Sequence, residues 1–174
     1  ISWIKEEICK SGAHNEPRPN FCDAVLIYSS KFDNDTDGFR PLKRWQRKGG
    51  YEGGGVLRIK RTQNIEINVE DIIEYSRIKI EFKFNPSKKV KKKDGFKVMI
   101  QLNETPGSIV WQKQFGKENN DNSFAKKRVW YDEAIVVETP DNATNILIQF
   151  EGLENNSKRG SYYIDNVVII GLQI

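Results

Sequence analysis

Apolar and polar residues alternate along several segments of the chain, as expected for β-strands with one face in a core and the other in solvent. The clearest runs lie at residues 57–60, 78–84, 96–102 and 146–150. Turn-forming glycine, proline, asparagine and aspartate residues separate these runs, and no long segment has a helical period. We therefore predict about nine or ten short strands that form an all-β antiparallel β-sandwich, or jelly roll.

The first 24 residues do not follow this alternation. Cys9 and Cys22 are the only cysteines, and they flank a proline-containing stretch. Two thiols that close a short loop indicate a disulfide in an oxidising compartment, although two free thiols in a cytosolic protein remain the alternative. We predict a short helical or irregular N-terminal extension, residues 1–24, tied by a Cys9–Cys22 disulfide, and one β-sandwich domain, residues 25–174.

The sequence also bears on the location of the protein. Because it begins at Ile1, we interpret it as a mature or excised piece. It has no apolar run near the roughly 20 residues that cross a bilayer. Sequons for N-glycosylation favour export. We expect a secreted, extracellular glycoprotein that is monomeric and does not insert into membranes. The sequons begin at Asn34, Asn103, Asn142 and Asn155.

The chain is mildly basic, with 28 Lys and Arg against 24 Asp and Glu and a formal net charge of +4. A lysine-rich surface that keeps a β-protein soluble explains this balance, and attraction to a polyanion is the alternative. Basic clusters with aromatic residues also fit a nucleic-acid surface. The many acidic residues and the features of secretion oppose that interpretation, so we expect no nucleic-acid partner.

Catalytic constellations are sparse. His14 is the single histidine, so any triad or Cys–His pair would depend on one residue in a proline-rich loop. Acidic residues are scattered and form no dense cluster of the kind a glycosidase needs. No glycine-rich phosphate loop is present. We therefore expect a protein without catalytic residues.

Three segments carry a family resemblance. Ser30–Phe39 reads SKFDNDTDGF, Gly53–Ile59 reads GGGVLRI, and Tyr162–Ile169 reads YYIDNVVI. This order resembles the jelly-roll carbohydrate-binding modules attached to polysaccharide-degrading enzymes, over roughly residues 25–174. The resemblance implies non-catalytic binding of a polysaccharide, with an acidic or sulfated polysaccharide as one option.

The same resemblance implies a structural calcium ion between the first and last strands. Calcium binds roughly six to eight oxygen ligands, and an aspartate inside an apolar strand needs a partner. Alternatively, the early aspartates form a turn, and the late one accepts backbone hydrogen bonds. The matching positions are Asp33 with Asp35 or Asp37 as helpers, the backbone near Gly54, and Asp165.

Candidate sugar-binding residues combine aromatic faces with polar side chains. Trp45 stands among polar neighbours, whereas the apolar neighbours of Trp111 favour the core. Lysines alternate with the core positions on two of the predicted strands, and they form one lysine-rich face if those strands are neighbours. Arg and Lys recognise carboxylate or sulfate by charge-assisted hydrogen bonds. The candidates are Trp45, Tyr51, Lys79, Lys83, Lys97, Gln101, Trp111 and Trp130.

Two other functions remain open. An extracellular adhesion or matrix domain that binds protein would fit the extension and the sequons, and an exposed apolar patch would favour it. A polysaccharide lyase or hydrolase on the same jelly-roll scaffold needs no fixed residue spacing. A deep cleft with Arg or Lys beside Tyr would favour that enzyme. Fold alone does not separate these functions.

Overall fold

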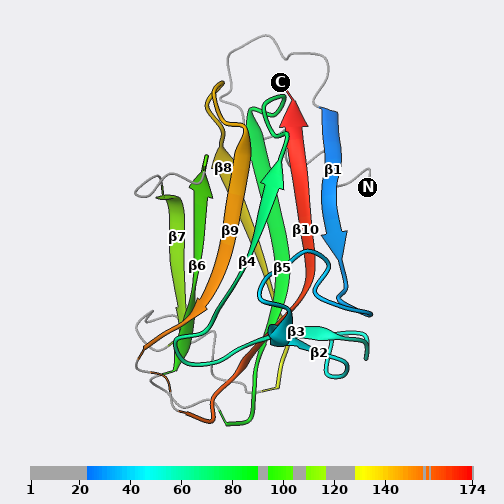
Figure 1. Ribbon diagram of the computed structural model, residues 1–174, viewed down its shortest axis with the longest axis vertical. Coiled ribbons are helices and arrows are strands. Elements are labelled where there is room, and N and C mark those ends of the chain that lie inside the picture. The colour runs from blue at the N-terminus through cyan, green and yellow to red at the C-terminus, as the bar shows by residue number, and fades with distance from the viewer. Residues whose placement is uncertain are drawn as a thin grey trace.

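The computed structural model describes residues 23–89, 94–103, 109–116, 128–154, 156 and 158–173. Two antiparallel sheets pack face to face as a β-sandwich (Figure 1), which confirms the predicted fold class. Residues 1–22 lie outside the described part, so the predicted extension and its disulfide stay predictions. No helix in the described part is long and apolar enough to cross a bilayer.

The described residues contain ten strands and one short 3-10 helix, η1 (Leu42–Arg44). Sheet A has the order β2-β3-β10-β5-β8, with β1 also paired to β10, and sheet B has the order β4-β9-β6-β7. The strands of sheet A are β1 (Asp23–Ser30), β2 (Trp45–Gln46), β3 (Val56–Ile59), β5 (Arg77–Pro86), β8 (Tyr131–Glu138) and β10 (Tyr162–Gln173). Those of sheet B are β4 (Asn64–Glu70), β6 (Gly95–Leu102), β7 (Ile109–Gly116) and β9 (Asn145–Gly152).

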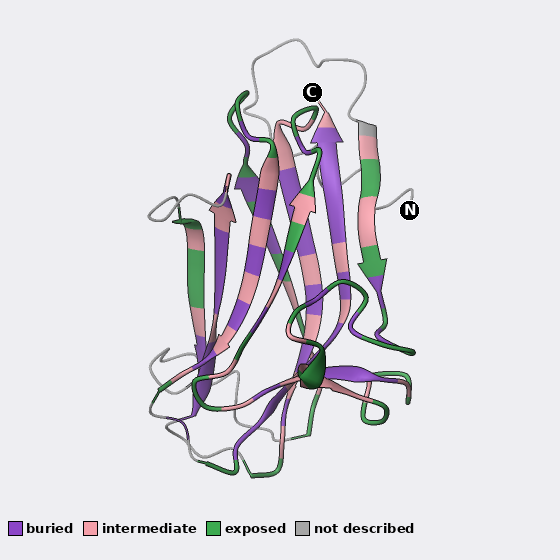
Figure 2. Ribbon diagram, in the orientation of Figure 1, coloured by how far each residue is buried: buried purple, intermediate pink, exposed green. Residues whose placement is uncertain are grey.

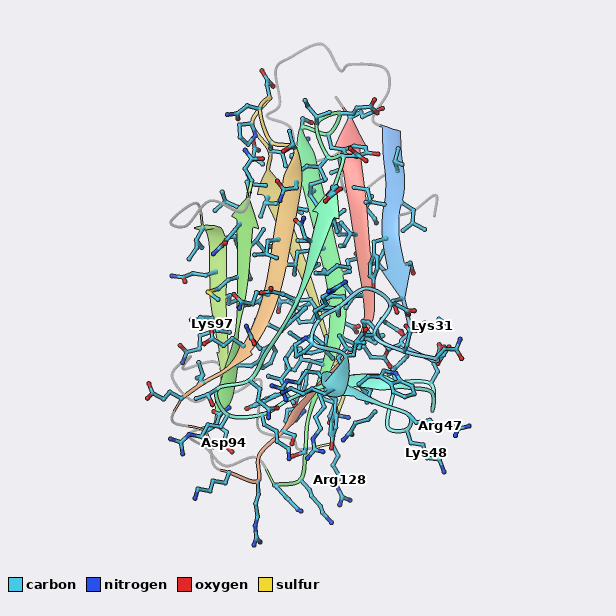
Figure 3. The ribbon with its side chains drawn as sticks, viewed as in Figure 1. Lys31, Arg47, Lys48, Asp94, Lys97 and Arg128 are labelled. Atoms are coloured by element: carbon cyan, nitrogen blue, oxygen red, sulfur yellow. The ribbon has the colours of Figure 1, made fainter. Side chains whose placement is uncertain are left out.

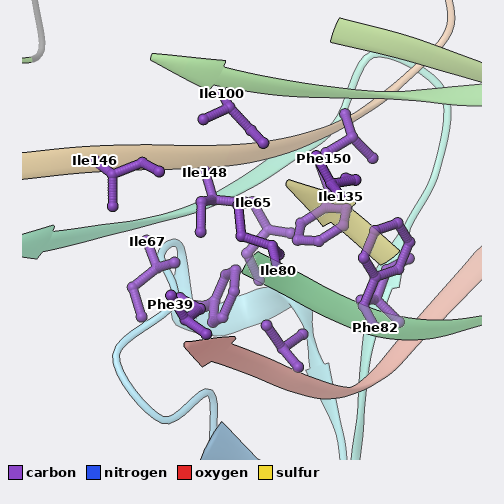
Figure 4. Close-up of a cluster of buried hydrophobic side chains, with 14 of the residues drawn as sticks. Phe39, Ile65, Ile67, Ile80, Phe82, Ile100, Ile135, Ile146, Ile148 and Phe150 are labelled. Atoms are coloured by element: carbon purple, nitrogen blue, oxygen red, sulfur yellow. The ribbon is translucent and has the colours of Figure 1, made fainter. Parts of the chain in front are cut away.

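The core lies between the two sheets and follows the predicted alternation. Figure 2 shows buried residues at every second position along β9, and β5 follows the same alternation from Ile80 onward. Phe82 of β5 and Phe150 of β9 meet across the sandwich with ring centroids 5.1 Å apart (Figure 4). Burying one such side chain contributes about 1.5–3 kcal/mol, so the inward faces of these strands hold the sheets together.

The condition for a single lysine-rich face, that its two strands be neighbours, is not met. The lysines of β5 and the polar residues of β6 do not form a single face, because β5 belongs to sheet A and β6 to sheet B. Both sets point away from the core, but on opposite sides of the sandwich. Alternation shows which side chains leave the core, whereas the pairing of strands depends on the connections between them.

Along one of its edges, β10 pairs first with β3 and then with β1. A candidate site lies where the partner changes. Its residues 162–164 pair with β3, and its residues 167–173 pair with β1. Its pairing with β5 shifts in register between Asp165 and Val168. Asn166, which lies inside that shift, has a φ of 48°. Asp165 therefore sits at a break in the sheet, where a side chain can meet a loop.

Candidate functional site

The outer face of sheet B presents side chains in rows that cross all four strands. Strands lie about 4.8 Å apart, so a row places one side chain at each such interval. None of the three rows contains an aromatic ring. From β4 to β7 the rows are Asn64, Glu151, Lys97, Gln114; then Glu66, Gln149, Met99, Gln112; then Asn68, Leu147, Gln101, Ile109.

The centre of this face is apolar, and the side chains around it are mostly amides, with Glu66 and the Lys97–Glu151 ion pair among them. Met99 is 9% exposed and Leu147 is half-buried beside it. The Nδ2 of Asn145 donates to the Oδ1 of Asn68 at 2.8 Å, which orients both side chains on neighbouring strands. An apolar floor with a few oriented polar groups is the usual composition of a small-molecule or sugar site.

A hollow of about 510 Å³ opens on the β4 side of this face. The segment before η1 forms its outer wall, because Arg40 and Glu66 exchange two backbone hydrogen bonds of 2.8 and 2.9 Å. The floor comes from β4 and β9. The lining residues are Gly38, Arg40, Glu66, Asn68, Glu70 and Leu147.

The β4 side chains of this face were not among the predicted ligand-binding residues. A signal was available, because Ile65, Ile67 and Val69 alternate with polar residues in the same way as the runs that were recognised. Of the eight predicted ligand-binding residues, only Lys97 and Gln101 lie in the three rows.

The predicted lysines are paired with acidic side chains. The Nζ of Lys79 lies 2.6 Å from a carboxylate oxygen of Glu81, and that of Lys97 lies 3.2 Å from Glu151. Lys83 forms an ion pair with Asp132. These pairs offset the positive charge locally, so the lysines that suggested an anionic ligand carry little uncompensated charge.

Three other predicted residues meet at one corner of sheet A. The rings of Tyr51 and Trp130 form an edge-to-face pair with centroids 5.8 Å apart. The Nζ of Lys83 lies 4.2 Å from the centroid of the Tyr51 ring, within cation–π distance. Tyr51 remains 45% exposed. Three segments distant in sequence thus build a small aromatic surface, on the sheet opposite to the rows of sheet B.

The other two predicted tryptophans are anchored. The Nε1 of Trp45 donates to the backbone oxygen of Phe32 at 2.6 Å, and its ring packs on the core. Trp111 lies opposite the buried Ile100 and also packs on the core. Both side chains therefore have a structural role, and Trp45 also lines a second hollow described below.

Asp165 is the most deeply buried carboxylate of the predicted calcium set, with 2% exposure. Its Oδ2 accepts the backbone N–H of Tyr51 at 2.6 Å, and its Oδ1 accepts that of Asn166 at 2.7 Å. Burial raises the pKa of this carboxyl, the two N–H groups oppose the rise, and the nearby Asp33 and Glu52 add to it. Asp165 thus lies among other carboxylates.

Backbone oxygens converge on the same place. A Cβ on Gly54 would overlap the Oδ1 of Asp33, and a Cβ on Gly50 would lie 2.8 Å from the Oδ2 of Asp165. The same Cβ on Gly50 would meet the carbonyl oxygens of Gly54 and Gly55. Only glycines allow these approaches. In the described residues, no three acidic, His or Cys side chains form a metal-binding group, so a cation here would depend on backbone oxygens.

Asp35 and Asp37 make their contacts elsewhere. The Oδ1 of Asp35 accepts the backbone N–H of Asp37 at 2.6 Å, which is an Asx-turn. The Asp37 carboxylate accepts the hydroxyl of Ser30, and its backbone oxygen accepts the hydroxyl of Tyr28 at 2.8 Å. Asp33 is therefore the member of this aspartate series that accompanies Asp165.

Comparisons with known proteins add the fold family. No protein-family model matches the sequence, and no curated protein sequence matches it. The CBM22-1 xylan-binding domain of Paenibacillus barcinonensis Xyn10C matches in structure with a TM-score of 0.58, over 87% of this chain and 97% of that domain. This chain shares the β-sandwich fold of that domain. This match is 12% identical, so it concerns the fold alone.

Two further solved structures share the fold. A family 16 carbohydrate-binding module matches with a TM-score of 0.53 and 14% identity, over 83% of this chain and 99% of that module. The K3 adhesin domain of Lys-gingipain from Porphyromonas gingivalis matches with a TM-score of 0.51 and 9% identity, over 85% of this chain and 99% of that chain. The resemblance drawn from the three sequence motifs is thus confirmed as a shared β-sandwich fold.

Proposed function

We propose that this protein binds a polysaccharide without transforming it, and that the outer face of sheet B is the binding surface. The observation that carries the proposal is the set of amide-bearing rows around Met99 and Leu147. These rows lie on a fold that is shared with a xylan-binding domain. Sugar rings would rest on the apolar floor while the amides hold their hydroxyls.

The spacing of the rows suits a linear polymer. Neighbouring strands are about 4.8 Å apart, which is close to the length of one sugar unit. Gln149 and Gln101 lie on adjacent strands in adjacent rows. An amide offers both a donor and an acceptor, so it can bond a hydroxyl in either orientation. A polysaccharide that crosses the strands would run parallel to the rows. Each of its sugars would then lie over one strand and meet that strand's side chain in a row.

The ligand of this face is uncharged in our proposal. Its one lysine in the rows, Lys97, is paired with Glu151. Glu66 and Glu70 line the hollow at the β4 edge together with a single cation, Arg40. An acidic or sulfated polysaccharide would therefore need another set of cations.

A structural calcium ion is part of the same proposal. Two carboxylates, Asp33 and Asp165, and the carbonyl oxygens near Gly54 form an oxygen-only donor set, which is the kind calcium prefers. Lys31 interacts electrostatically with both aspartates, but it is already paired with Glu52 at 2.6 Å. A bound calcium ion would offset the repulsion among the acidic groups and hold the β2–β3 loop on β10.

Secretion belongs to the proposal as well, because an extracellular polysaccharide is the usual target of such a module and the sequons fit export.

A protein-binding adhesion domain is the second candidate. Leu26 is 62% exposed and Val136 is 49% exposed, and they lie at the two ends of one row on the outer face of sheet A, with Ile170 and Lys79 between them. This apolar surface would serve a protein partner better than a sugar.

The test is a binding titration against a panel of neutral polysaccharides, including xylan and mannan. Gln149→Ala should weaken binding, because it removes one amide from the centre of the face. Gln173→Ala, at the end of β10 in sheet A, is the matched control and should bind normally. Equal affinity of wild type and Gln149→Ala would exclude this face, and failure of the wild type to bind any member would exclude the proposed function.

A further inference from the structure

A second hollow, of about 160 Å³, lies at the β2–β3 end of the molecule and is lined by basic side chains. Its walls carry Lys43 and Arg44 from η1 and Arg58 and Lys60 from β3 and the residue after it. Trp45 and two glutamines complete the lining, and no acidic residue belongs to it. Four cations thus surround a space large enough for one small group.

These four cations differ from the other lysines of the protein. Lys31, Lys79, Lys83, Lys97 and Lys113 each form an ion pair with an acidic side chain. No ion pair involves the four hollow-lining cations in the part of the chain that the structure describes. The Nε of Arg44 is buried without a hydrogen-bond partner. Their positive charge is therefore uncompensated.

The cations also repel one another. Arg58 lowers the pKa of Lys60, with smaller contributions from burial and from Lys89. The neighbouring Lys89 extends the basic surface to the end of β5. Like charges that are held together by the fold are stabilised when an anion binds between them. The fold keeps Arg58 in place, since its Nε donates to the Oγ of Ser161 at 3.1 Å.

The hollow adjoins the proposed binding face. The segment 38–44 lines the first hollow through Gly38 and Arg40, and it lines the basic hollow through Lys43 and Arg44. At the other wall, the backbone oxygen of Gln63 accepts the N–H of Gly152 at the end of β9, at 2.8 Å. A polymer that leaves the face of sheet B at its β4 edge can therefore reach the cations.

We infer that the basic hollow binds a carboxylate or sulfate group of an acidic polysaccharide whose uncharged part lies on sheet B. This inference rests on the proposed function. Lysine and arginine bind such anions through charge-assisted hydrogen bonds, and an arginine can hold two oxygens at once. Trp45 offers an aromatic surface beside them for a sugar ring.

A nucleic acid is the less fitting occupant. Binding of single strands uses a basic track with several aromatic side chains on which successive bases stack. The basic hollow has one tryptophan and room for one small group. A sugar acid or a sugar sulfate matches these dimensions, and its anionic group would take the place of the missing acidic partners.

The experiment uses the whole chain and two double variants with equal loss of charge. Lys43→Gln/Lys60→Gln removes two cations from the hollow. Arg47→Gln/Lys48→Gln removes two exposed cations that follow β2 and do not line the hollow. Both residues lie at the outer margin of the molecule in Figure 3. Affinity is measured for lightly sulfated xylan as the sulfated probe, glucuronate-substituted xylan as the carboxylated probe, unsubstituted neutral xylan, and a single-stranded oligonucleotide, each at low and moderate salt.

We expect wild type to bind the sulfated or the glucuronate-substituted xylan more tightly than neutral xylan, and the preferred probe identifies the anionic group. Lys43→Gln/Lys60→Gln should lose about tenfold or more of that affinity, as expected for two charge-assisted contacts. Arg47→Gln/Lys48→Gln should lose less than about twofold, because an exposed charge outside the site acts only at long range and is screened by salt.

Four results would overturn the inference. Equal losses in the two double variants would show that only net charge matters. Tighter binding of the oligonucleotide, with the same loss in Lys43→Gln/Lys60→Gln, would assign the hollow to nucleic acid. Binding of neutral xylan alone would overturn the role of the hollow and leave the proposed function standing, whereas no binding to any polysaccharide would overturn both.

Discussion

The backbone N–H of Tyr51 donates to the Oδ2 of Asp165 at 2.6 Å, although the two residues are 114 positions apart. This bond joins the loop between β2 and β3 to the break in β10. It also holds the Tyr51 ring near Trp130 at the corner of sheet A. The candidate calcium position and the aromatic corner therefore depend on the same loop.

Removal of calcium should destabilise the folded protein. We expect the melting temperature of wild type to fall in EDTA, and Asp165→Asn to melt at a lower temperature than wild type in calcium and to respond less to EDTA. Differential scanning calorimetry with the metal content measured beside it would check this. A wild type that holds no calcium at millimolar concentrations and melts at one temperature in both buffers would rule the ion out.

The calcium effect should depend on pH. Without the ion, burial raises the pKa of Asp165, so the folded state holds its proton more tightly than the unfolded state does. The contribution of Asp165 to the free energy of unfolding is therefore present below its pKa in the unfolded state. It is lost as the pH rises through the higher pKa of the folded state. Calcium favours the ionised form, so the gain in melting temperature should be larger at about pH 7 than at about pH 4. An equal gain at both values would contradict this.

Neighbouring positions on β9 should separate stability from binding. Phe150 is fully buried and contacts Phe39 and Phe82, whereas Gln149 faces outward. Phe150→Ala should lower the free energy of unfolding by about 3–5 kcal/mol. Gln149→Ala should change it by less than about 0.5 kcal/mol. Urea denaturation measures both, and a large loss in Gln149→Ala would mean that this side chain supports the fold.

Trp45 should behave as a structural residue. Trp45→Phe removes the N–H that bonds the backbone oxygen of Phe32 and leaves that oxygen without its partner. The expected loss is about 1–3 kcal/mol in the free energy of unfolding. Denaturation monitored by circular dichroism would show it. Unchanged stability would mean that the indole N–H contributes no net stabilisation.

Alternation in the sequence predicted the strands and their buried faces, because a half-buried strand must repeat every two residues. It could not predict that β5 and β6 lie in different sheets, since pairing depends on the connections. The closing motif located Asp165, and the Asp-rich turn located Asp33. Asp37 lies apart from Asp33 and Asp165 because it accepts hydrogen bonds from the hydroxyls of Tyr28 and Ser30. The spacing of residues in the sequence does not reveal such contacts.

The candidate binding residues were harder to predict than the fold. Polar neighbours around Trp45 suggested exposure, yet its indole N–H reaches a backbone oxygen 13 positions earlier. Tyr51, Lys83 and Trp130 meet only because the fold brings three separate segments together at this corner. The rows of sheet B depend on the register of four strands, and alternation in a single sequence does not reveal which strands pair.

The most direct test of polysaccharide binding at sheet B is isothermal titration calorimetry of wild type and the double variant Gln101→Ala/Gln149→Ala with soluble polysaccharides, beside Gln173→Ala. We predict at least about a tenfold loss of affinity for the double variant, corresponding to two lost hydrogen bonds, and wild-type affinity for Gln173→Ala. Wild-type affinity of Gln101→Ala/Gln149→Ala, with its fold intact by circular dichroism, would contradict the assignment of this face.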